Sequence, residues 1–287
     1  KTKTQLVQFW DTPSRCILAV AAEKIYKNHP YAKLALGTHE SLNKITRDDC
    51  FDFYQKNISA FQAIFSIVGN LQKYDVEPLI EKKLGSWRSP SVADLIYPAI
   101  DDVKPESFSI FKNRDQVVLA FAGISVDRKH LDYDALLVFD QLLTGGMSSR
   151  LFELREQSGL FYTIGGSVVY GSAKQPGMIF IKTIVSKDRL DEAQQAIAQC
   201  LNSAVDTISI DEFEQAKEVI INSFPLMFET YENTANTLAF LEKYNFDLNY
   251  LEQRIDTIRA LTLEDVKSIV KKYVSMQKIL NIKIGRI

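Results

Sequence analysis

The sequence contains few of the residues that form disulfides or redox centres. Its three cysteines, Cys16, Cys50 and Cys200, are widely spaced, odd in number and in no Cys-x-x-Cys pair. This pattern does not indicate a zinc knuckle or a redox couple, and we expect three buried thiols. Such cysteine usage fits a reducing compartment, but periplasmic proteins can be equally poor in cysteine, so the compartment stays open.

Histidine is equally scarce, which bears on metal binding. The only histidines are His29, His39 and His130. Catalytic zinc normally needs two imidazoles on one face, as His-Glu-x-x-His or His-x-x-Glu-His supplies. His39-Glu40 does not replace these motifs, because adjacent side chains point in different directions. The sequence also lacks a Gly-x-Ser-x-Gly elbow, a Cys-His signature and a phosphate loop. We expect no metal or cofactor in this chain.

Neither net charge nor a long apolar run points to nucleic acid or a membrane. The 34 basic and 36 acidic residues give a net charge of −2, so no global field attracts nucleic acid or an anionic membrane. No apolar run approaches the roughly 18 residues of a membrane span. Hydrophobic residues make up 46% and charged residues 24%, a balance that is typical of globular proteins.

The length of 287 residues favours two domains. Prolines, serines and aspartates without helical periodicity predict a linker at 89–105. Residues 1–88 then belong to a first α+β domain, and residues 106–287 form a second α+β domain.

Apolar periodicity predicts the elements of these domains. Helices are expected at 16–28, 46–54, 76–84, 131–143, 190–205, from 209 onward and at 262–273. Strands are expected at 61–68, 108–111, 117–126, 161–171, 178–184 and 279–284. Strand pairs and long helices without strict βαβ alternation predict an α+β fold, with antiparallel sheets covered by helices.

One similarity within the chain suggests a repeat. Residues 45–56 and 261–273 each read as a helix with a threonine cap and acidic first turn, and each precedes a predicted strand. Duplication of one unit would produce this pattern. A coincidence of common capping residues explains it equally well.

The segment from Thr144 to Tyr162 is the most unusual part of the sequence. Gly145-Gly146 breaks one helix, and Ser148 or Ser149 caps the next. Glycines at such a joint can let the backbone approach a ligand closely, although a plain helix C-cap has the same pattern. By residue type alone, the arginine and tyrosine that follow at 155 and 162 read as a solvated side chain and a core side chain.

The stretch GGMSSRLFELREQSGLFYTIG (residues 145–165) resembles the diagnostic segment of the pitrilysin/insulinase family of zinc metallopeptidases, which includes the mitochondrial processing peptidases. HPYAKLALGTHESLNKITRDDCFDFYQKNISAFQAIFSIVGNL (residues 29–71) is similar to that family's run from a His-Pro-Tyr loop to a strand ending in Val-Gly, and LTLEDVKSIVKKYV (residues 261–274) resembles its closing helix. The resemblance spans about residues 5 to 285 and is most specific between 144 and 166.

The resemblance implies a clamshell of two halves, each made of two related α+β domains. In that family one half holds zinc and the other contributes an arginine and a tyrosine to the peptide at that zinc. Matching the motif places these roles on Arg155 and Tyr162, and places a loop that contacts substrate at Gly145, Gly146, Met147 and Ser148. Relative to the family, Lys1 falls inside the first domain, so the resemblance implies that residues 1–88 are the C-terminal part of that domain. Since His-x-x-Glu-His is also absent, the chain resembles an inactive, metal-free half or a C-terminal portion.

Two functions follow as expectations. In the first, the chain binds peptide and completes a zinc endopeptidase whose zinc lies on a partner half or subunit. In the second, it is a proteolytically inactive scaffold or peptide-binding protein of the same fold. A zinc site formed by His29 and His39 is a third hypothesis, and the ligand spacing argues against it. The family resemblance favours a bacterial envelope location, with the cytoplasm as the alternative, and the substrate stays open.

Overall fold

The computed structural model describes residues 1–87 and 95–287, which group into two units. Unit 1 comprises residues 1–37, 97–221 and 254–287, and unit 2 comprises residues 38–96 and 222–253. Each unit therefore contains segments that are far apart in the sequence.

The predicted domain linker falls partly outside the described residues. Residues 89–94 of the linker are not described, and residues 95–105 have no regular secondary structure. The division into a first domain at 1–88 and a second at 106–287 stays a prediction.

Unit 1 is built on one five-stranded sheet with the order β1-β5-β2-β4-β3. The strands are β1 (Ser107–Phe111), β2 (Gln116–Ile124), β3 (Thr163–Tyr170), β4 (Met178–Ser186) and β5 (Leu280–Gly285). Only β1 and β5 pair in parallel, and the other three pairings are antiparallel. The expected α+β class and the predicted β3–β4 hairpin are confirmed.

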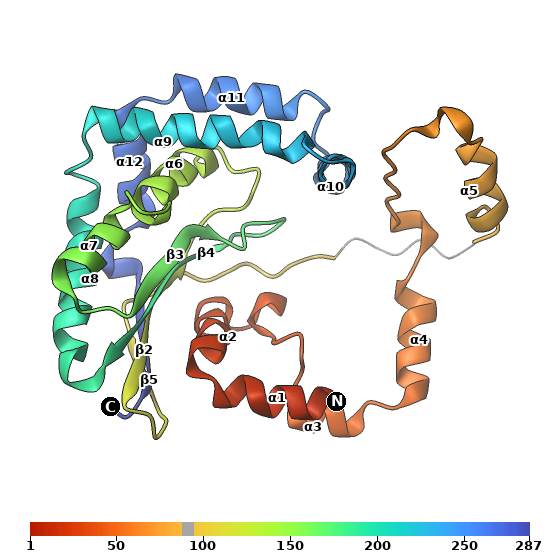
Figure 1. The fold of residues 1–287 in the computed structure, drawn as a ribbon. Helices are drawn as coiled ribbons and strands as arrows, with labels where there is room; N and C mark the ends of the chain where they lie inside the picture. The colour runs from red at the N-terminus through yellow and green to blue at the C-terminus, as the bar shows by residue number, and fades with distance from the viewer. Residues whose placement is uncertain (88–94) are drawn as a thin grey trace. The chain divides into compact units, whose positions relative to one another are not determined.

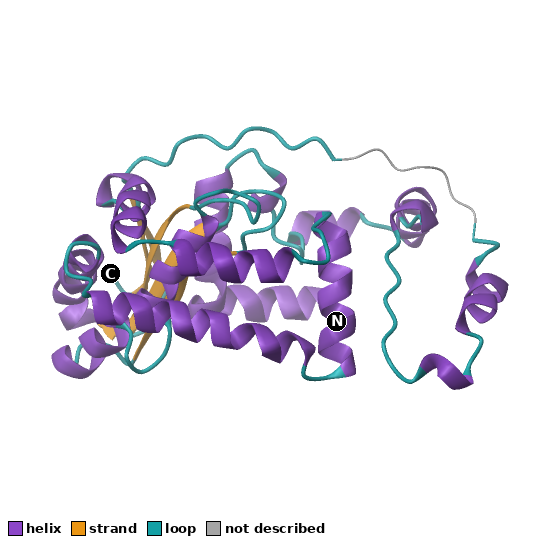
Figure 2. Ribbon diagram, turned by 90° about the horizontal axis from the view of Figure 1, so that it is seen from above, coloured by secondary structure: helices purple, strands orange, loops and turns teal. Residues whose placement is uncertain are grey.

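Helices cover both faces of this sheet. Figure 1 shows α2 on one side of the strands and α6, α8 and α12 on the other, and the view from above shows the strands between helices (Figure 2). The helices that lie wholly or mainly in unit 1 are α1 (Thr2–Asp11), α2 (Pro13–Tyr26), α6 (Tyr133–Thr144), α7 (Arg150–Ser158), α8 (Leu190–Ala204), α9 (Ile210–Ser223), α11 (Tyr250–Ala260) and α12 (Leu263–Tyr273).

Alternation along β2 explains why both faces of the sheet are buried. Val118, Ala120 and Ala122 share a core cluster with the apolar side of α2, while Leu119 and Phe121 on the opposite face are at most 1% exposed. Successive side chains of a strand point to opposite faces, so a strand covered on both sides must be apolar throughout. Burying each large aliphatic or aromatic side chain contributes about 1.5–3 kcal/mol.

Unit 2 is helical in its described residues. Its complete helices are α3 (His39–Lys44), α4 (Arg47–Asn57), α5 (Val76–Leu84) and α10 (Tyr231–Tyr244). Thr46 caps α4 as predicted, because its hydroxyl accepts from the Asp49 amide at 3.2 Å while Asp49 accepts from the Thr46 amide at 2.8 Å. The Thr46 hydroxyl and the Thr46 amide both donate to the Asp49 carboxylate, and these two hydrogen bonds hold the pKa of Asp49 below its usual value.

The strand predicted at 61–68 does not form. Residues 60–62 make a short 3-10 helix, residues 63–68 have no regular secondary structure, and Phe61 and Phe65 are 71% and 59% exposed. A strand needs the backbone of a neighbour to complete its hydrogen bonds, and the described residues of unit 2 contain no second strand. The prediction was wrong because the apolar pattern alone does not supply that neighbour.

The expectation of three buried thiols holds only in part. Cys16 is buried on α2, Cys200 on α8 is partly buried, and Cys50 on α4 is exposed. The Cys50 position follows from α4, which has no buried residue in unit 2. No helix among the described residues combines the length and the apolar character needed to cross a bilayer.

Candidate functional site

The candidate site begins where α6 ends and the chain turns into α7. Gly145 follows the last residue of α6, and its amide donates to the Gln141 carbonyl at 2.9 Å. A Cβ on Gly145 would lie 2.3 Å from that carbonyl oxygen, and Gly146 has φ +99°. Both positions of the turn therefore need glycine, which is the backbone reason for the Gly-Gly pair.

The turn presents two side chains to solvent and turns one inward. Met147 is 81% exposed and Ser148 is exposed, whereas Ser149 is only 4% exposed. The Ser149 hydroxyl donates to the Gly146 carbonyl at 2.7 Å and makes no capping hydrogen bond to α7. Ser149 is thus the N-cap residue by position, but its side chain closes the turn instead of capping the helix.

Arg155 lies in the last turn of α7 and keeps much of its hydrogen-bonding capacity. Its Nη1 lies 3.4 Å from Glu156 Oε1, and 38% of the Arg155 side chain is exposed. The guanidinium also lies 5.7 Å from the centre of the Phe152 ring. Its Nε is buried without a hydrogen-bond partner among the described residues. The exposed part of a planar guanidinium held in this way can still donate to a carbonyl or carboxylate oxygen of a ligand.

Tyr162 follows the C-terminal end of α7. Gly159 ends α7 in the left-handed region at φ 60°, and Leu160 and Phe161 are then buried at 8% and 6% exposure. The next side chain, Tyr162, is 74% exposed, and its amide donates to the Ile184 carbonyl at 3.1 Å. The residue-type expectation of a core tyrosine is wrong, because the two preceding apolar residues occupy the core and turn Tyr162 outward.

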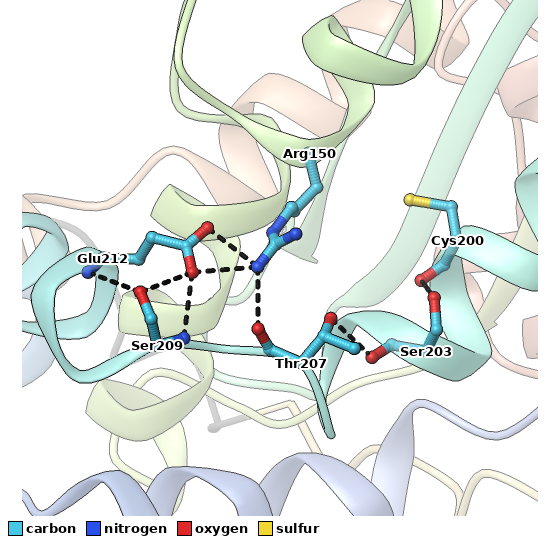
Figure 3. A network of polar contacts seen from close by, with 6 residues as sticks. All are labelled: Arg150, Cys200, Ser203, Thr207, Ser209 and Glu212. Carbon is cyan, nitrogen blue, oxygen red and sulfur yellow. Dashed lines mark hydrogen bonds and ion pairs between the residues drawn. The ribbon is translucent and has the colours of Figure 1, made fainter.

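An ion-pair network holds the start of α7 in place (Figure 3). Arg150 Nη2 donates to the Thr207 carbonyl at 3.0 Å and lies 2.8 Å from Glu212 Oε1. The Ser209 hydroxyl accepts from the Glu212 amide at 3.2 Å, and the Glu212 carboxylate accepts from the Ser209 amide at 2.9 Å, so these two residues form a capping box at the start of α9. The network therefore fixes α7 to the first turn of α9.

The charge on Glu212 is favoured by this geometry. Partial burial disfavours the ionised carboxylate, but hydrogen bonds from Ser209 and the neighbouring Arg150 outweigh it, and the pKa of Glu212 lies below its usual value. The ion pair is consequently formed at neutral pH.

The histidines do not assemble a metal site. His29 is buried, and its Nδ1 accepts from the Tyr31 amide at 3.1 Å. His130 Nδ1 accepts from the Asp132 amide at 3.0 Å, and His39 begins α3. Within residues 1–87 and 95–287, no group of three or more His, Cys, Asp or Glu side chains could hold an ion. The donor set in this part of the chain does not fit zinc.

The structure places the predicted site residues along one short helix and its two ends. Gly145 to Ser148 precede α7, Arg155 lies within it, and Tyr162 follows it. No hydrogen bond or ion pair between described residues joins Arg155 to Tyr162. Sequence reasoning missed Arg150 and Asp140, whose partners lie more than twenty residues away in the chain and leave no local spacing signal.

Comparison with known proteins supports a family assignment. The family described as "Peptidase M16 inactive domain" matches residues 44–220. "Uncharacterized zinc protease YmxG" of Bacillus subtilis is 24% identical over 272 residues, which cover 93% of this chain and 65% of that protein. "Non-peptidase homolog YmxG" of Helicobacter pylori is 22% identical over 257 residues, which cover 88% of this chain and 58% of that protein.

A solved structure shows the same fold. The crystal structure of a peptidase M16 inactive domain from Pseudomonas fluorescens superposes with a TM-score of 0.88 at 22% identity, covering all of this chain and 69% of that one. This chain spans less than two thirds of the length of the two YmxG relatives. The family match covers more than half of the present sequence, and the chain belongs to the peptidase M16 inactive-domain family.

Proposed function

We propose that this chain is the non-catalytic half of a zinc endopeptidase of the pitrilysin/insulinase type. In this proposal it binds a peptide and contributes Arg155 and Tyr162 to an active site whose zinc lies on a partner half or subunit. The observation that carries the proposal is the exposed Tyr162 side chain, 74% accessible directly after two buried anchors. A solvent-facing tyrosine held by such anchors is suited to reach a bound ligand.

The residues around α7 supply two kinds of interaction with a peptide. The Arg155 guanidinium can donate to peptide carbonyls, because 38% of its side chain is exposed. The Tyr162 hydroxyl, which has no hydrogen-bond partner among the described residues, can donate to an oxyanion that develops on the peptide. The exposed residues Met147 and Ser148 lie at the other end of α7 and would contact the peptide further along its length. Zinc on the partner would supply the activated water.

The role of Tyr162 is tested in a complex reconstituted with a subunit that carries His-x-x-Glu-His. We expect Tyr162→Phe to lower turnover by about 10²- to 10³-fold, as loss of an oxyanion donor does, while peptide affinity changes little. Tyr170→Phe is the matched control, because Tyr170 is an exposed tyrosine at the far end of β3, the strand that begins directly after Tyr162. Unchanged turnover in Tyr162→Phe would show that the assigned role is wrong.

A proteolytically inactive scaffold or peptide-binding protein is the second candidate. The Helicobacter pylori relative, described as a non-peptidase homolog, favours it. Peptide affinity of Arg155→Ala separates the two candidates, with Arg189→Ala, an exposed arginine in another part of unit 1, as the control. A clear loss of affinity in Arg155→Ala alone would show that Arg155 contacts the peptide, as the peptidase half requires, and equal affinity in both variants favours the scaffold.

A further inference from the structure

A bulge interrupts β3, the strand that begins directly after Tyr162. The pairing of β3 with β4 is regular from Thr163 opposite Ile184 to Ser167 opposite Phe180, and the next pair is Tyr170 opposite Met178. Between the last two pairs β3 advances from 167 to 170, three residues, and β4 from 180 to 178, two residues. One extra residue on β3 therefore frees backbone groups from the ladder.

The carboxylate of Asp140 takes up these freed groups. Its Oδ1 accepts from the Val168 amide at 2.7 Å, and its Oδ2 accepts from the Ser167 hydroxyl at 2.8 Å. Ser167 Oγ in turn accepts from the Val169 amide at 3.0 Å. Val168 is fully buried, so its amide would lose its partner without Asp140, and an unsatisfied buried amide is costly.

Asp140 also belongs to the helix that leads into the glycine turn. It lies in the last part of α6, where the Thr144 hydroxyl donates to the Asp140 carbonyl at 3.0 Å and to its Oδ1 at 3.3 Å. Thr144 immediately precedes Gly145. One side chain therefore connects the end of α6, from which the turn departs, with the bulge of the strand that follows Tyr162.

We infer that Asp140 is a positioning residue that fixes the register of β3 and thereby keeps Tyr162 facing outward. A slip of one residue in a strand moves every side chain to the opposite face. The bulged arrangement offers the Val168 amide and the Ser167 hydroxyl together to the Asp140 carboxylate. This inference rests on the proposed function, because outward presentation of Tyr162 matters only if Tyr162 contacts a ligand.

The inference is tested by peptide binding with three variants of the full chain, using fluorescein-labelled oxidised insulin B chain as the probe. Asp140→Ala removes both acceptors, and we expect affinity to fall by at least about tenfold, because a shifted β3 turns the whole Tyr162 side chain, ring included, away from the peptide. Asp140→Asn keeps an acceptor for the Val168 amide, and we expect it to retain most of the affinity.

Val270→Ala is the control for destabilisation alone. Val270 is fully buried on α12, so this variant weakens the core away from α7 and β3. Peptide affinities of the unmodified chain and the three variants are compared well below their melting temperatures. Unchanged affinity in Asp140→Ala, or an equal loss in Val270→Ala, overturns the inference.

Hydrogen exchange separates failure of the inference from failure of the proposed function. If the unmodified chain binds no peptide, the proposed function fails. The register of β3 is then followed by two measurements that need no peptide: hydrogen exchange of the β3 amides, and the rate at which tetranitromethane nitrates Tyr162. Asp140→Ala is then expected to speed exchange at Val168 and to change the nitration rate, whereas Asp140→Asn is not. Identical exchange and nitration in Asp140→Ala and the unmodified chain would overturn the inference independently.

Discussion

Asp140 is a carboxylate whose surroundings oppose its charge. Burial raises the pKa of Asp140, and the hydrogen bonds from Val168, Ser167 and Thr144 offset only part of this effect. Because the folded state holds the proton more tightly than the unfolded chain, folding stability falls as pH rises from the ordinary value of 3.8 through the raised folded value. The ionised side chain is thus maintained at a cost to stability.

We therefore predict that Asp140→Asn removes this component of the pH dependence. The free energy of unfolding of the variant, measured in urea at a series of pH values, should fall less than that of the unmodified chain as pH rises above 3.8. Glu212→Gln is a control of opposite sign. Because the pKa of Glu212 is lowered, its contribution is present above the usual value and disappears as pH falls through the folded value. Parallel curves for Asp140→Asn and the unmodified chain would contradict the prediction.

Gly146 is a second residue whose effect on local structure can be tested by substitution, here by adding a Cβ atom. Its φ of +99° lies where side chains are strained, although nothing within 4 Å would meet an added Cβ. We expect Gly146→Ala to lower the free energy of unfolding by about 1–2 kcal/mol. Gly165→Ala is the matched control, because Gly165 also has open space and lacks a positive φ. Equal stability of the two variants in thermal denaturation would show that the turn relaxes.

At the scale of elements, α7 is a short helix whose position depends on its neighbours. It has nine residues, and only Leu151 is buried. An amphipathic face of that size does not hold a helix by itself. The Arg150 contacts to Thr207 and Glu212 therefore fix the direction in which α7 carries Arg155.

We expect Arg150→Met to lower the free energy of unfolding by about 1–2 kcal/mol, because it leaves Glu212 and the Thr207 carbonyl without their shared donor. A double-mutant cycle with Glu212→Gln isolates the pairwise energy. Arg189→Met is the comparison, since the Arg189–Glu192 pair is exposed and exposed pairs contribute little. Additive effects of Arg150→Met and Glu212→Gln would mean that the ion pair does not couple the two helices.

Local signals account for the elements that could be predicted from the sequence. The Thr-x-x-Asp pattern predicted the starts of α4 and α12, and both have the reciprocal hydrogen bonds of a capping box. Helix α1 was not predicted, and its N-cap Lys1 makes no side-chain hydrogen bond. The same limit explains the failed strand at 61–68, because strand formation depends on a partner and not on the apolar pattern alone. The repeat suggested by α4 and α12 stays a prediction.

The candidate site residues that were predicted also have local sequence signals, whereas those that were missed depend on distant partners. The glycine turn, Arg155 and Tyr162 lie within one continuous stretch and could be named from it. Asp140 and Arg150 act on residues 28 and 62 positions away, and no spacing rule connects such pairs. The outward direction of Tyr162 depends on Leu160 and Phe161 filling the core, which is a result of packing.

At the scale of the whole molecule, unit 2 exposes an unusual amount of apolar surface. Between residues 51 and 67 the exposed large apolar side chains are Phe51, Phe53, Tyr54, Ile58, Phe61, Ile64, Phe65 and Ile67. Exposed apolar surface on this scale promotes association. The described residues of unit 2 thus contain a segment that favours contact with another apolar surface.

We expect the isolated chain to self-associate with rising concentration, and the double variant Phe61→Ser/Phe65→Ser to do so less. Sedimentation velocity over a concentration series measures this directly. Leu131→Ser is the control, because Leu131 is a single apolar side chain, 95% exposed, outside this segment. Equal association of the double variant and the unmodified chain would exclude the segment as the contact surface.

The strand order of the sheet has a consequence for synthesis of the chain. β5 lies between β1 and β2, and Ser107 pairs with Asn281, a separation of 281 − 107 = 174 residues. A ribosome that adds about 5–20 residues per second needs roughly 10–35 s to cover that separation. During this time β2, β4 and β3 can pair with one another, while β1 has no partner strand. The newly synthesised chain therefore carries one unpaired strand until β5 has been made.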